Sequence, residues 1–271
     1  MQLTDTHCHI HEADQAHLGS GATRARWAKA EDPNPDHMVA RAAEAGVARL
    51  LCVGTTLADS AEAIEFAARH PQVWATIGIH PHEAGATMAD STAVKTFQSL
   101  ATKPKVVAIG ECGLDYYYDH SPKEAQIRCL EMQMQLALEH NLPMVFHVRD
   151  AFADFWPIFD AHPGIRGAVH CFTASKTELD QCLARGLYVG LNGIMTFTTQ
   201  SAQLEAAKAV PLDHLLLETD APFLTPAPYR AIMNEPKYVR NIAEFLANLR
   251  GEALEMLADA TTTNARTLFG I

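Results

Sequence analysis

The sequence predicts an α/β protein of the TIM (β/α)8 barrel class, with residues 1–271 forming a single domain. Short apolar runs of strand length recur along the chain, and amphipathic helical patterns separate them. A barrel of this class needs about 250 residues, which fits the length of this chain. A doubly wound open sheet is the competing architecture. It often has a Gly-rich turn after its first strand, and no such turn follows Leu3–His9.

Eight segments have the length and apolar composition of buried parallel strands, which is the number that closes a TIM barrel. Active sites of such barrels lie at the carboxyl ends of the strands, so polar residues at those ends are the candidates for function. The predicted strands are, in order, Leu3–His9, Arg49–Val53, Val73–Ile79, Val106–Glu111, Met144–Val148, Gly167–Cys171, Leu187–Leu191 and Leu215–Asp220.

Helix-start signals fall between these strands. The runs 121–124 and 175–178 each read as a capping box, and Pro122 stands at the first helical position of the former. Pro236 is predicted to open another helix after the eighth strand, and residues 252–268 are predicted to form the last helix. The alternation of strand and helix therefore runs through the whole chain.

Charge and composition narrow the class of protein. The chain carries 21 Lys and Arg against 32 Asp and Glu, a net charge of -11, which argues against a basic footprint for duplex nucleic acid. No apolar stretch is long enough to cross a membrane, and the start of the chain has no signal-peptide pattern, so we expect a cytoplasmic protein with no membrane contact. The six cysteines form no C-x-x-C pair and are expected to be reduced.

Metal-ligand residues collect at the ends of five predicted strands. Asp5, His7 and His9 share one face of the first strand because side chains alternate along it. The other side chains of this kind are Glu111, His147, His170, Glu218 and Asp220. A single His on a strand is more often a packing residue than a ligand, but ligand-type residues at five strand ends are hard to obtain by accident.

Four His, one Glu and one Asp at one end of a barrel can hold two divalent ions, and Glu111 is placed to bridge them. Zn, Mn, Mg and Fe all accept this ligand set. Such a pair of ions activates water at neutral pH, so the predicted reaction is hydrolysis. Cys8, Cys112 and Cys171 each follow a proposed ligand, and alternation turns their thiols away from it into a packing role.

The motifs at these strand ends resemble the TatD family of metal-dependent hydrolases over nearly the whole chain. Supporting motifs are residues 77–82 and 234–236. The main ones are Asp5-Thr6-His7-Cys8-His9, Gly110-Glu111-Cys112-Gly113-Leu114-Asp115-Tyr116-Tyr117, His147-Val148-Arg149-Asp150, His170-Cys171-Phe172-Thr173 and Glu218-Thr219-Asp220-Ala221-Pro222.

The resemblance implies an amidohydrolase-type barrel with two divalent ions (Mg, Mn or Zn) and a deoxyribonuclease activity that includes 3′–5′ trimming of single-stranded DNA. It assigns His7, His9, Glu111 and Asp220 to one ion, and Glu111, His147 and His170 to the other. Asp220 would also take a proton from the attacking water. Glu218 would either bond that water or a substrate hydroxyl, or orient its neighbours.

Each of the residues that would contact the substrate has two interpretations. His80, which we rank above His82, is placed either to contact a substrate phosphate or to make ordinary loop hydrogen bonds. Arg149 is placed either to pair with a phosphate or to form a salt bridge with a neighbouring loop acid. The run 116–118 of three tyrosines offers either a stacking surface for a base or packing under the loop.

Two segments depart from the family. The loop after the eighth strand keeps Arg230 as its basic residue where the family has a basic Arg-Gly-Lys-type segment, which lowers its capacity to hold phosphates. The first loop, residues 11–35, is long and carries Arg24, Arg26, Trp27 and Lys29. Our hypothesis is that it supplies the missing charge and a stacking surface, and the alternative is a lid unrelated to substrate.

The leading functional prediction is therefore a cytoplasmic phosphodiesterase that trims single-stranded DNA, with no obligate protein partner. The alternative keeps the metal site and changes the substrate to a small ester, lactone, amide or phosphate ester, which the apolar run 231–233 favours. A non-catalytic binding protein would forfeit the water-activating carboxylates, and these are present.

Overall fold

The computed structural model describes residues 1–14, 21–118 and 120–271, so part of the predicted first loop, residues 15–20, lies outside the described residues. The chain divides into two compact units. The first unit consists of Met1–Cys52 and Cys171–Ile271, and the second consists of Val53–His170. Each unit is described by itself below. The prediction of a single domain over residues 1–271 stays a prediction.

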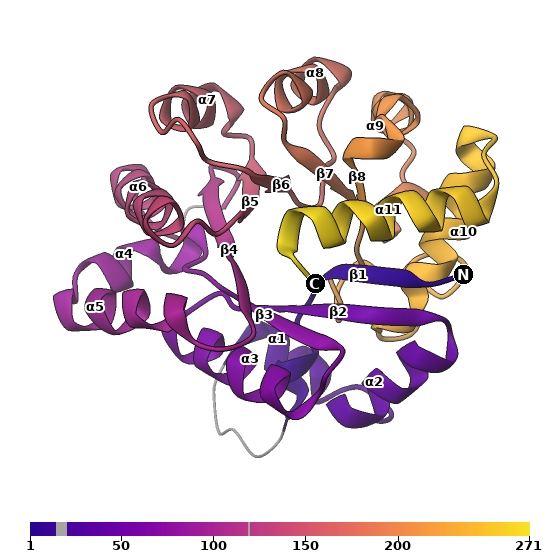
Figure 1. Cartoon of the computed structure of the whole chain (residues 1–271), viewed down its shortest axis with the longest axis horizontal. Coiled ribbons are helices and arrows are strands. Elements are labelled where there is room, and N and C mark those ends of the chain that lie inside the picture. Colours follow the sequence, from indigo (N-terminus) through magenta and orange to yellow (C-terminus); the bar gives the residue numbers. More distant parts are fainter. Residues whose placement is uncertain (15–20, 119) are drawn as a thin grey trace. The chain divides into compact units, whose positions relative to one another are not determined.

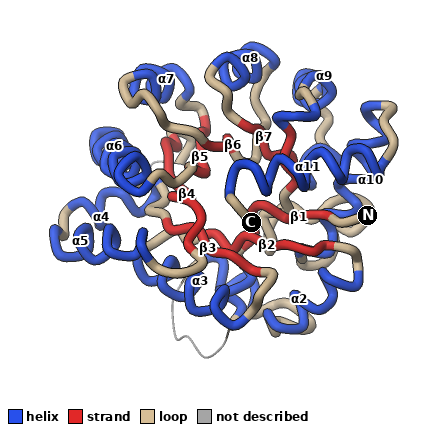
Figure 2. Tube along the Cα trace, viewed as in Figure 1, coloured by secondary structure: helices blue, strands red, loops and turns tan. Residues whose placement is uncertain are grey.

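Eight strands form one sheet in which the spatial order follows the chain order, β1 to β8, and helices follow the strands along the chain (Figures 1 and 2). The recorded strand pairs are parallel. The strands are β1 (Leu3–Cys8), β2 (Val47–Val53), β3 (Val73–Ile77), β4 (Val106–Asp115), β5 (Met144–Arg149), β6 (Gly167–Val169), β7 (Tyr188–Leu191) and β8 (Leu215–Leu217).

Within the first unit, the chain that leaves β8 continues the ladder along β1. The N–H of Asp220 donates to the carbonyl of His7 at 2.8 Å, and the N–H of His9 donates to the carbonyl of Ala221 at 2.8 Å. The eighth strand therefore lies beside the first. Eight parallel strands in chain order with this closure are the TIM-barrel class, so the predicted fold class is confirmed.

The described residues of the first unit form six α-helices, and their buried faces follow the apolar periodicity. In the helix that follows β8, Val239, Ile242 and Leu246 are buried at helical spacing, and Pro236 opens a 3-10 turn (Pro236–Tyr238) ahead of it, close to the predicted start. The helices are α1 (Ala22–Trp27), α2 (Pro35–Glu44), α8 (Lys176–Ala184), α9 (Ser201–Ala209), α10 (Val239–Arg250) and α11 (Leu254–Phe269).

The second unit contains the helices between β2 and β6, and one predicted start signal there is wrong. Ser121 does not cap the following helix, which begins at Lys123 with Pro122 at the N-cap and not at the first helical position. The Ser121 hydroxyl instead donates to the carbonyl of His82 at 2.6 Å and accepts from the N–H of Gly85 at 3.0 Å. In the first unit Ser175 does occupy the N-cap position of α8, but its side chain makes no capping bond. The helices are α3 (Leu57–Arg69), α4 (Ala84–Met88), α5 (Ser91–Ser99), α6 (Lys123–His140) and α7 (Phe152–Asp160).

The strand ends differ most from the prediction at β4 and β8, and β3 and β6 also end two residues before their predicted ends, at Ile77 and Val169. β4 does not end at Glu111 but runs on to Asp115, pairing Gly113 with His147 of β5 and Asp115 with Arg149. The pairing of β4 with β5 shifts register between residues 109 and 112. Because the strand continues beyond this irregularity, its backbone groups stay hydrogen-bonded to β5. β8 ends at Leu217, so Glu218 and Asp220 follow the strand and do not lie in it.

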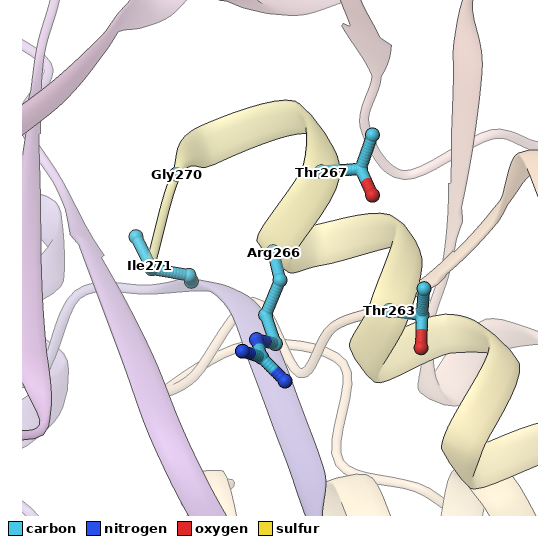
Figure 3. Close-up of a pocket in the computed structure, with 5 residues that line it drawn as sticks. All are labelled: Thr263, Arg266, Thr267, Gly270 and Ile271. Atoms are coloured by element: carbon cyan, nitrogen blue, oxygen red, sulfur yellow. The ribbon is translucent and has the colours of Figure 1, made fainter.

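Three further features do not belong to the predicted ligand set. All six cysteines are free thiols, and those of Cys8 and Cys112 donate to main-chain carbonyls of neighbouring strands, as a packing role requires. None of the helices in the described residues is long and apolar enough to span a membrane. A surface pocket at the end of α11 (Figure 3) is near the amino end of β1, because Thr262 on the same helix donates to the carbonyl of Gln2.

Candidate metal centre

The first unit brings three of the predicted ligands together at the carboxyl end of β1. His7 Nε2 lies 3.3 Å from His9 Nε2, and Asp220 Oδ1 lies 3.4 Å from His9 Nε2 and 3.7 Å from His7 Nε2. The alternation along β1 places both rings on one face, as predicted. Both histidines are buried, and the Asp220 side chain keeps 15% of its surface exposed. The carboxylate is thus the part of this cluster that opens to solvent.

Asp5 fixes the segment that carries Asp220. Its carboxylate accepts the backbone N–H of Thr219 at 2.9 Å and lies 2.6 Å from the Thr219 hydroxyl, while Asn234 donates to the Thr219 carbonyl at 2.8 Å. Complete burial raises the pKa of Asp5 well above its ordinary value, against the effect of these hydrogen bonds. Asp5 therefore has a positioning role that the sequence motif did not assign to it.

The second unit gathers its ligand atoms around a single carboxylate oxygen. Glu111 Oε1 lies 2.8 Å from His147 Nδ1, 2.9 Å from His170 Nε2 and 3.4 Å from His80 Nε2. His147 Nδ1 is also 3.3 Å from His170 Nε2. Glu111 and His170 are buried, and the other two rings are half-buried. The predicted ligands of the second unit thus meet, and His80 joins them.

These charges shift one another's pKa. Burial alone would raise the pKa of Glu111, but His170, His80 and His147 hold it well below its ordinary value. Burial lowers the pKa of His80 to about 4, so that ring is neutral near pH 7 and acts as a hydrogen-bond partner without a positive charge. For His147 burial lowers the pKa, but the bonds to Asp115 and Glu111 reverse this and raise it.

Both clusters fit a divalent metal ion. Ligand atoms held about 2.1 Å from one ion lie about 3.0 Å apart in octahedral geometry and about 3.4 Å apart in tetrahedral geometry. The separations of 3.3 to 3.7 Å in the first unit lie near the tetrahedral value, and those of 2.8 to 3.3 Å among Glu111, His147 and His170 in the second lie around the octahedral one. Imidazole nitrogen with carboxylate oxygen is the donor set of such ions.

A second observation supports the fit in the second unit. His147 Nε2 bonds Asp115 Oδ2 at 2.9 Å, so the proton of a neutral ring belongs on Nε2. In the neutral ring the lone pair on Nδ1 then faces Glu111 Oε1 across 2.8 Å, so two acceptors oppose each other unless the ring is protonated or a cation is bound.

Glycine is required for Glu111 to reach its position. Gly110 has a φ of +143°, and a side chain there would overlap the backbone of Val145 on β5. Gly113 has a φ of +149° and approaches the carbonyl of His147 too closely for any Cβ. The two glycines therefore let β4 pass against β5 while Glu111 turns to the histidines.

Asp115 is the residue that the motif analysis missed as a functional candidate. Its Oδ2 accepts from His147 Nε2 and lies 3.1 Å from His82 Nε2, and its Oδ1 accepts the N–H groups of Tyr117 and Tyr118. The bonds to the two histidines hold its pKa below the ordinary value despite burial. The signal was present, since Asp115 lies four residues beyond Glu111 and shares its strand face.

Glu218 is buried and engaged by its own unit. Its Oε1 accepts the N–H of Cys171 at 2.6 Å and lies 3.2 Å from the side-chain nitrogen of Asn192. These bonds fit the orienting role that the sequence left open beside a catalytic one. Asn192 was not identified from the sequence.

The predicted substrate contacts occupy different surroundings. Arg149 is exposed, and its guanidinium lies over the rings of Tyr117 and Tyr118. Arg230 is held within the first unit: its guanidinium lies 3.7 Å from the centre of the Phe197 ring and donates to the carbonyl of Thr225.

The hypothesis that the first loop supplies a stacking surface is wrong for Trp27. This side chain is 1% exposed, and its indole N–H donates to the carbonyl of His9 at 3.0 Å. Arg24 is likewise turned to the carbonyl of Glu12, and Arg26 lies over the ring of Phe223. Trp27 lies at the end of α1 beside the segment that follows β1, where burial removes its large apolar ring from water.

Comparison with known proteins gives a consistent result. The model of the TatD related DNase family matches residues 4–270. A protein of Citrobacter rodentium called 3′-5′ ssDNA/RNA exonuclease TatD is 40% identical over 263 residues, which are 94% of this chain and 97% of the relative. The protein of that name from Salmonella typhimurium is 39% identical over 264 residues, covering 94% and 98%.

Solved structures agree in fold. A TatD homologue of Escherichia coli K12, YjjV, superposes with a TM-score of 0.84 at 26% identity, covering 99% of this chain and 98% of the other. A TatD family hydrolase of Entamoeba histolytica gives a TM-score of 0.86 at 23% identity, with coverage of 99% and 98%.

Proposed function

The chain belongs to the TatD related DNase family, and from that premise we propose that it is a divalent-metal-dependent phosphodiesterase that removes nucleotides from the 3′ ends of single-stranded DNA. The observation that carries the proposal is the ring of three imidazoles around Glu111 Oε1, together with the separate cluster of His7, His9 and Asp220. The names of the two curated relatives support this substrate and polarity.

The proposal places two ions, Mg, Mn or Zn, at the carboxyl ends of the strands. The ligands of one ion are His7, His9, Glu111 and Asp220, and those of the other are Glu111, His147 and His170. When bound, the ions supply Lewis acidity that lowers the pKa of a water and offsets charge on the phosphate. The separations within each unit support the grouping of His7 with His9 and Asp220, and that of Glu111 with His147 and His170.

The chain's own residues carry the remaining chemistry. Asp220, whose carboxylate is partly exposed, takes a proton from the attacking water. Glu218 is the first residue after β8, and its carboxylate accepts the N–H of Cys171, which holds the segment after β8 in position. His80 is neutral near pH 7 with Nδ1 accepting the N–H of His82, so its Nε2 is a hydrogen-bond donor for a carboxylate or phosphate oxygen.

The net charge of the chain predicts how the affinity for DNA depends on salt and metal. The net charge of -11 repels DNA at long range, so we expect weak affinity that falls steeply with salt and depends on the metal. A cytoplasmic location and the absence of an obligate protein partner stay predictions from the sequence.

The test is hydrolysis of single-stranded DNA by protein that has been stripped of metal and then re-supplied with Mg, Mn or Zn. DNA labelled at the 5′ end yields a ladder of shortening products if nucleotides leave from the 3′ end, whereas DNA labelled at the 3′ end releases a labelled mononucleotide at once. Glu111→Gln is assayed beside the wild type, because it keeps the side-chain shape and removes the charge that three imidazoles surround.

Metal-restored trimming that is lost in Glu111→Gln supports the proposal. Failure to cut single-stranded DNA with any ion, by protein that still binds metal, contradicts it. That result would favour a small ester or phosphate ester as substrate, for which the half-exposed Ile232 in the loop after β8 offers an apolar contact.

A further inference from the structure

Two exposed aromatic rings and a cation stand together in the second unit, beyond the end of β4. Tyr117 is 59% exposed and Tyr118 is 42% exposed, which is unusual for large rings. The Arg149 guanidinium lies 4.1 Å from the centre of the Tyr117 ring and 4.8 Å from that of Tyr118. Within the part of the chain that the structure describes, no acidic partner is recorded for Arg149. Its charge is therefore oriented by the rings and open to solvent.

Hydrogen bonds through Asp115 connect Tyr117 and Tyr118 to the histidine cluster of the same unit. Asp115 Oδ1 accepts the backbone N–H groups of Tyr117 and Tyr118, each at 3.0 Å, while its other oxygen accepts from His147. The strand ladder adds a bond from the N–H of Tyr116 to the carbonyl of Arg149 at 2.9 Å. One carboxylate thus sets the position of the tyrosine pair and of a proposed metal ligand.

The neighbouring rings differ in what they can still bind. Tyr116 is occupied, because its hydroxyl donates to Asp154 at 2.9 Å and the ammonium of Lys123 lies 3.8 Å from its ring centre. Tyr118 has His120 stacked on it at 5.7 Å and 20°. Tyr117, the most exposed of the three, makes contacts with Tyr118 and Arg149 and keeps ring surface free for a flat ligand.

We propose that Tyr117, Tyr118 and Arg149 form a subsite for the nucleotide next to the scissile phosphate, with its base stacked on Tyr117 and its phosphate bound by Arg149. The inference rests on the proposed function and adds the place where a second nucleotide is held. Bases stack on aromatic rings with little regard to sequence, and a guanidinium matches phosphate with two parallel hydrogen bonds. A local cation of this kind also offsets the repulsion of a chain with net charge -11.

The first experiment measures stacking directly. Single-stranded DNA carrying 2-aminopurine at successive positions from the 3′ end, with phosphorothioate linkages that resist cutting, is bound to metal-loaded protein that keeps Glu111. We expect strong quenching at one internal position. Tyr117→Leu in the same background should abolish that quenching, whereas Tyr188→Leu, a tyrosine stacked on His214 at the amino end of β7, should preserve it.

The second experiment uses otherwise wild-type protein and two substrates. Tyr117→Leu should raise KM for single-stranded DNA about tenfold, which corresponds to roughly 1.4 kcal/mol and lies in the range of base stacking. Arg149→Gln should raise it similarly, and Arg149→Lys should recover part of the loss. kcat should change less than KM, and the loss should be smaller with bis(p-nitrophenyl) phosphate than with DNA.

The outcomes separate this inference from the proposed function. DNA trimming with KM and quenching unchanged in Tyr117→Leu overturns the subsite and leaves the nuclease standing. An equal loss with both substrates, accompanied by a lower Tm, assigns the tyrosine pair a structural role and also overturns the subsite. Hydrolysis of bis(p-nitrophenyl) phosphate without any cutting of DNA overturns the proposed function and the subsite with it.

Discussion

The Asp115 carboxylate holds His147 by its Nε2 nitrogen at 2.9 Å and so turns the Nδ1 nitrogen toward Glu111. The same carboxylate accepts two backbone N–H groups from the loop that follows β4. A carboxylate bonded to the far nitrogen of a metal-ligating imidazole fixes the ring and raises its basicity. Asp115 therefore couples the positions of Tyr117 and Tyr118 to the metal affinity of the proposed site.

Replacing Asp115 by Asn should lower metal affinity about 10- to 100-fold, which is the usual effect of losing such a partner. The amide has one acceptor oxygen, so it cannot serve both His147 and the backbone N–H groups that the carboxylate bonds. Titration of metal-free protein followed by calorimetry measures the change. Asp154→Asn, which alters a carboxylate bonded to the Tyr116 hydroxyl, is the matched control. Equal affinity in Asp115→Asn and the control would exclude this role.

The metal-free protein should lose stability as the pH falls from about 6.5 toward 4, in part because of His80. Burial lowers its pKa to about 4, while the unfolded chain takes up the proton near pH 6.5. The free energy of unfolding therefore rises with pH across this window, by roughly 2 to 3 kcal/mol from this residue. His147 acts in the opposite sense: its raised pKa stabilises the fold below pH 6.5, and this contribution is lost as the pH rises through that pKa.

Urea unfolding at several pH values, in the presence of a chelator, measures the effect. His80→Gln should flatten the dependence between pH 4 and 6.5, and the exposed His140→Gln should leave it as in the wild type. Identical slopes in His80→Gln and the wild type would show that His80 does not titrate in this way.

Trp27→Ala should destabilise the protein by about 3 to 5 kcal/mol, because it empties a fully buried site. Trp27→Phe should cost less, but it leaves the carbonyl of His9 without the indole donor. Equilibrium unfolding measures both variants. A Trp27→Ala protein of normal stability whose KM for DNA has risen would instead restore the idea that this side chain meets the substrate.

Glu218→Gln should retain most of the activity, and Glu218→Ala should lose about 100-fold, if the residue acts by positioning. Gln preserves an acceptor for the N–H of Cys171, which Ala does not. If Glu218 acts by positioning, the pH profile of kcat in Glu218→Gln should match that of the wild type. Loss of its acid limb would instead show that the Glu218 carboxylate exchanges a proton during the reaction.

Much of this fold follows from the sequence because strands and ligands obey simple periodicities. The eight apolar runs became the eight strands in the expected order, and alternation along β1 placed His7 and His9 on one face. The helix after β8 likewise buries the stripe that its spacing predicts.

Other features depended on contacts that no local pattern contains. Ser121 had the sequence of a capping residue but bonds the carbonyl of His82, 39 residues away. Trp27 was interpreted as an exposed stacking residue, because its contact with the carbonyl of His9, 18 residues away, cannot be seen in the local sequence. Asp115 and Asp5 shared faces with ligands, yet their positioning roles became visible only when the hydrogen bonds to His147 and Thr219 were known.

The metal content of the protein tests the central claim most directly. Wild-type and Glu111→Gln proteins are dialysed against Mn or Zn, and bound metal per chain is measured by mass spectrometry. We expect two ions bound by the wild type and a loss of at least one in Glu111→Gln, since three imidazoles converge on the Glu111 Oε1 oxygen. A wild-type chain that binds no ion, or a Glu111→Gln chain that binds as many as the wild type, would contradict it.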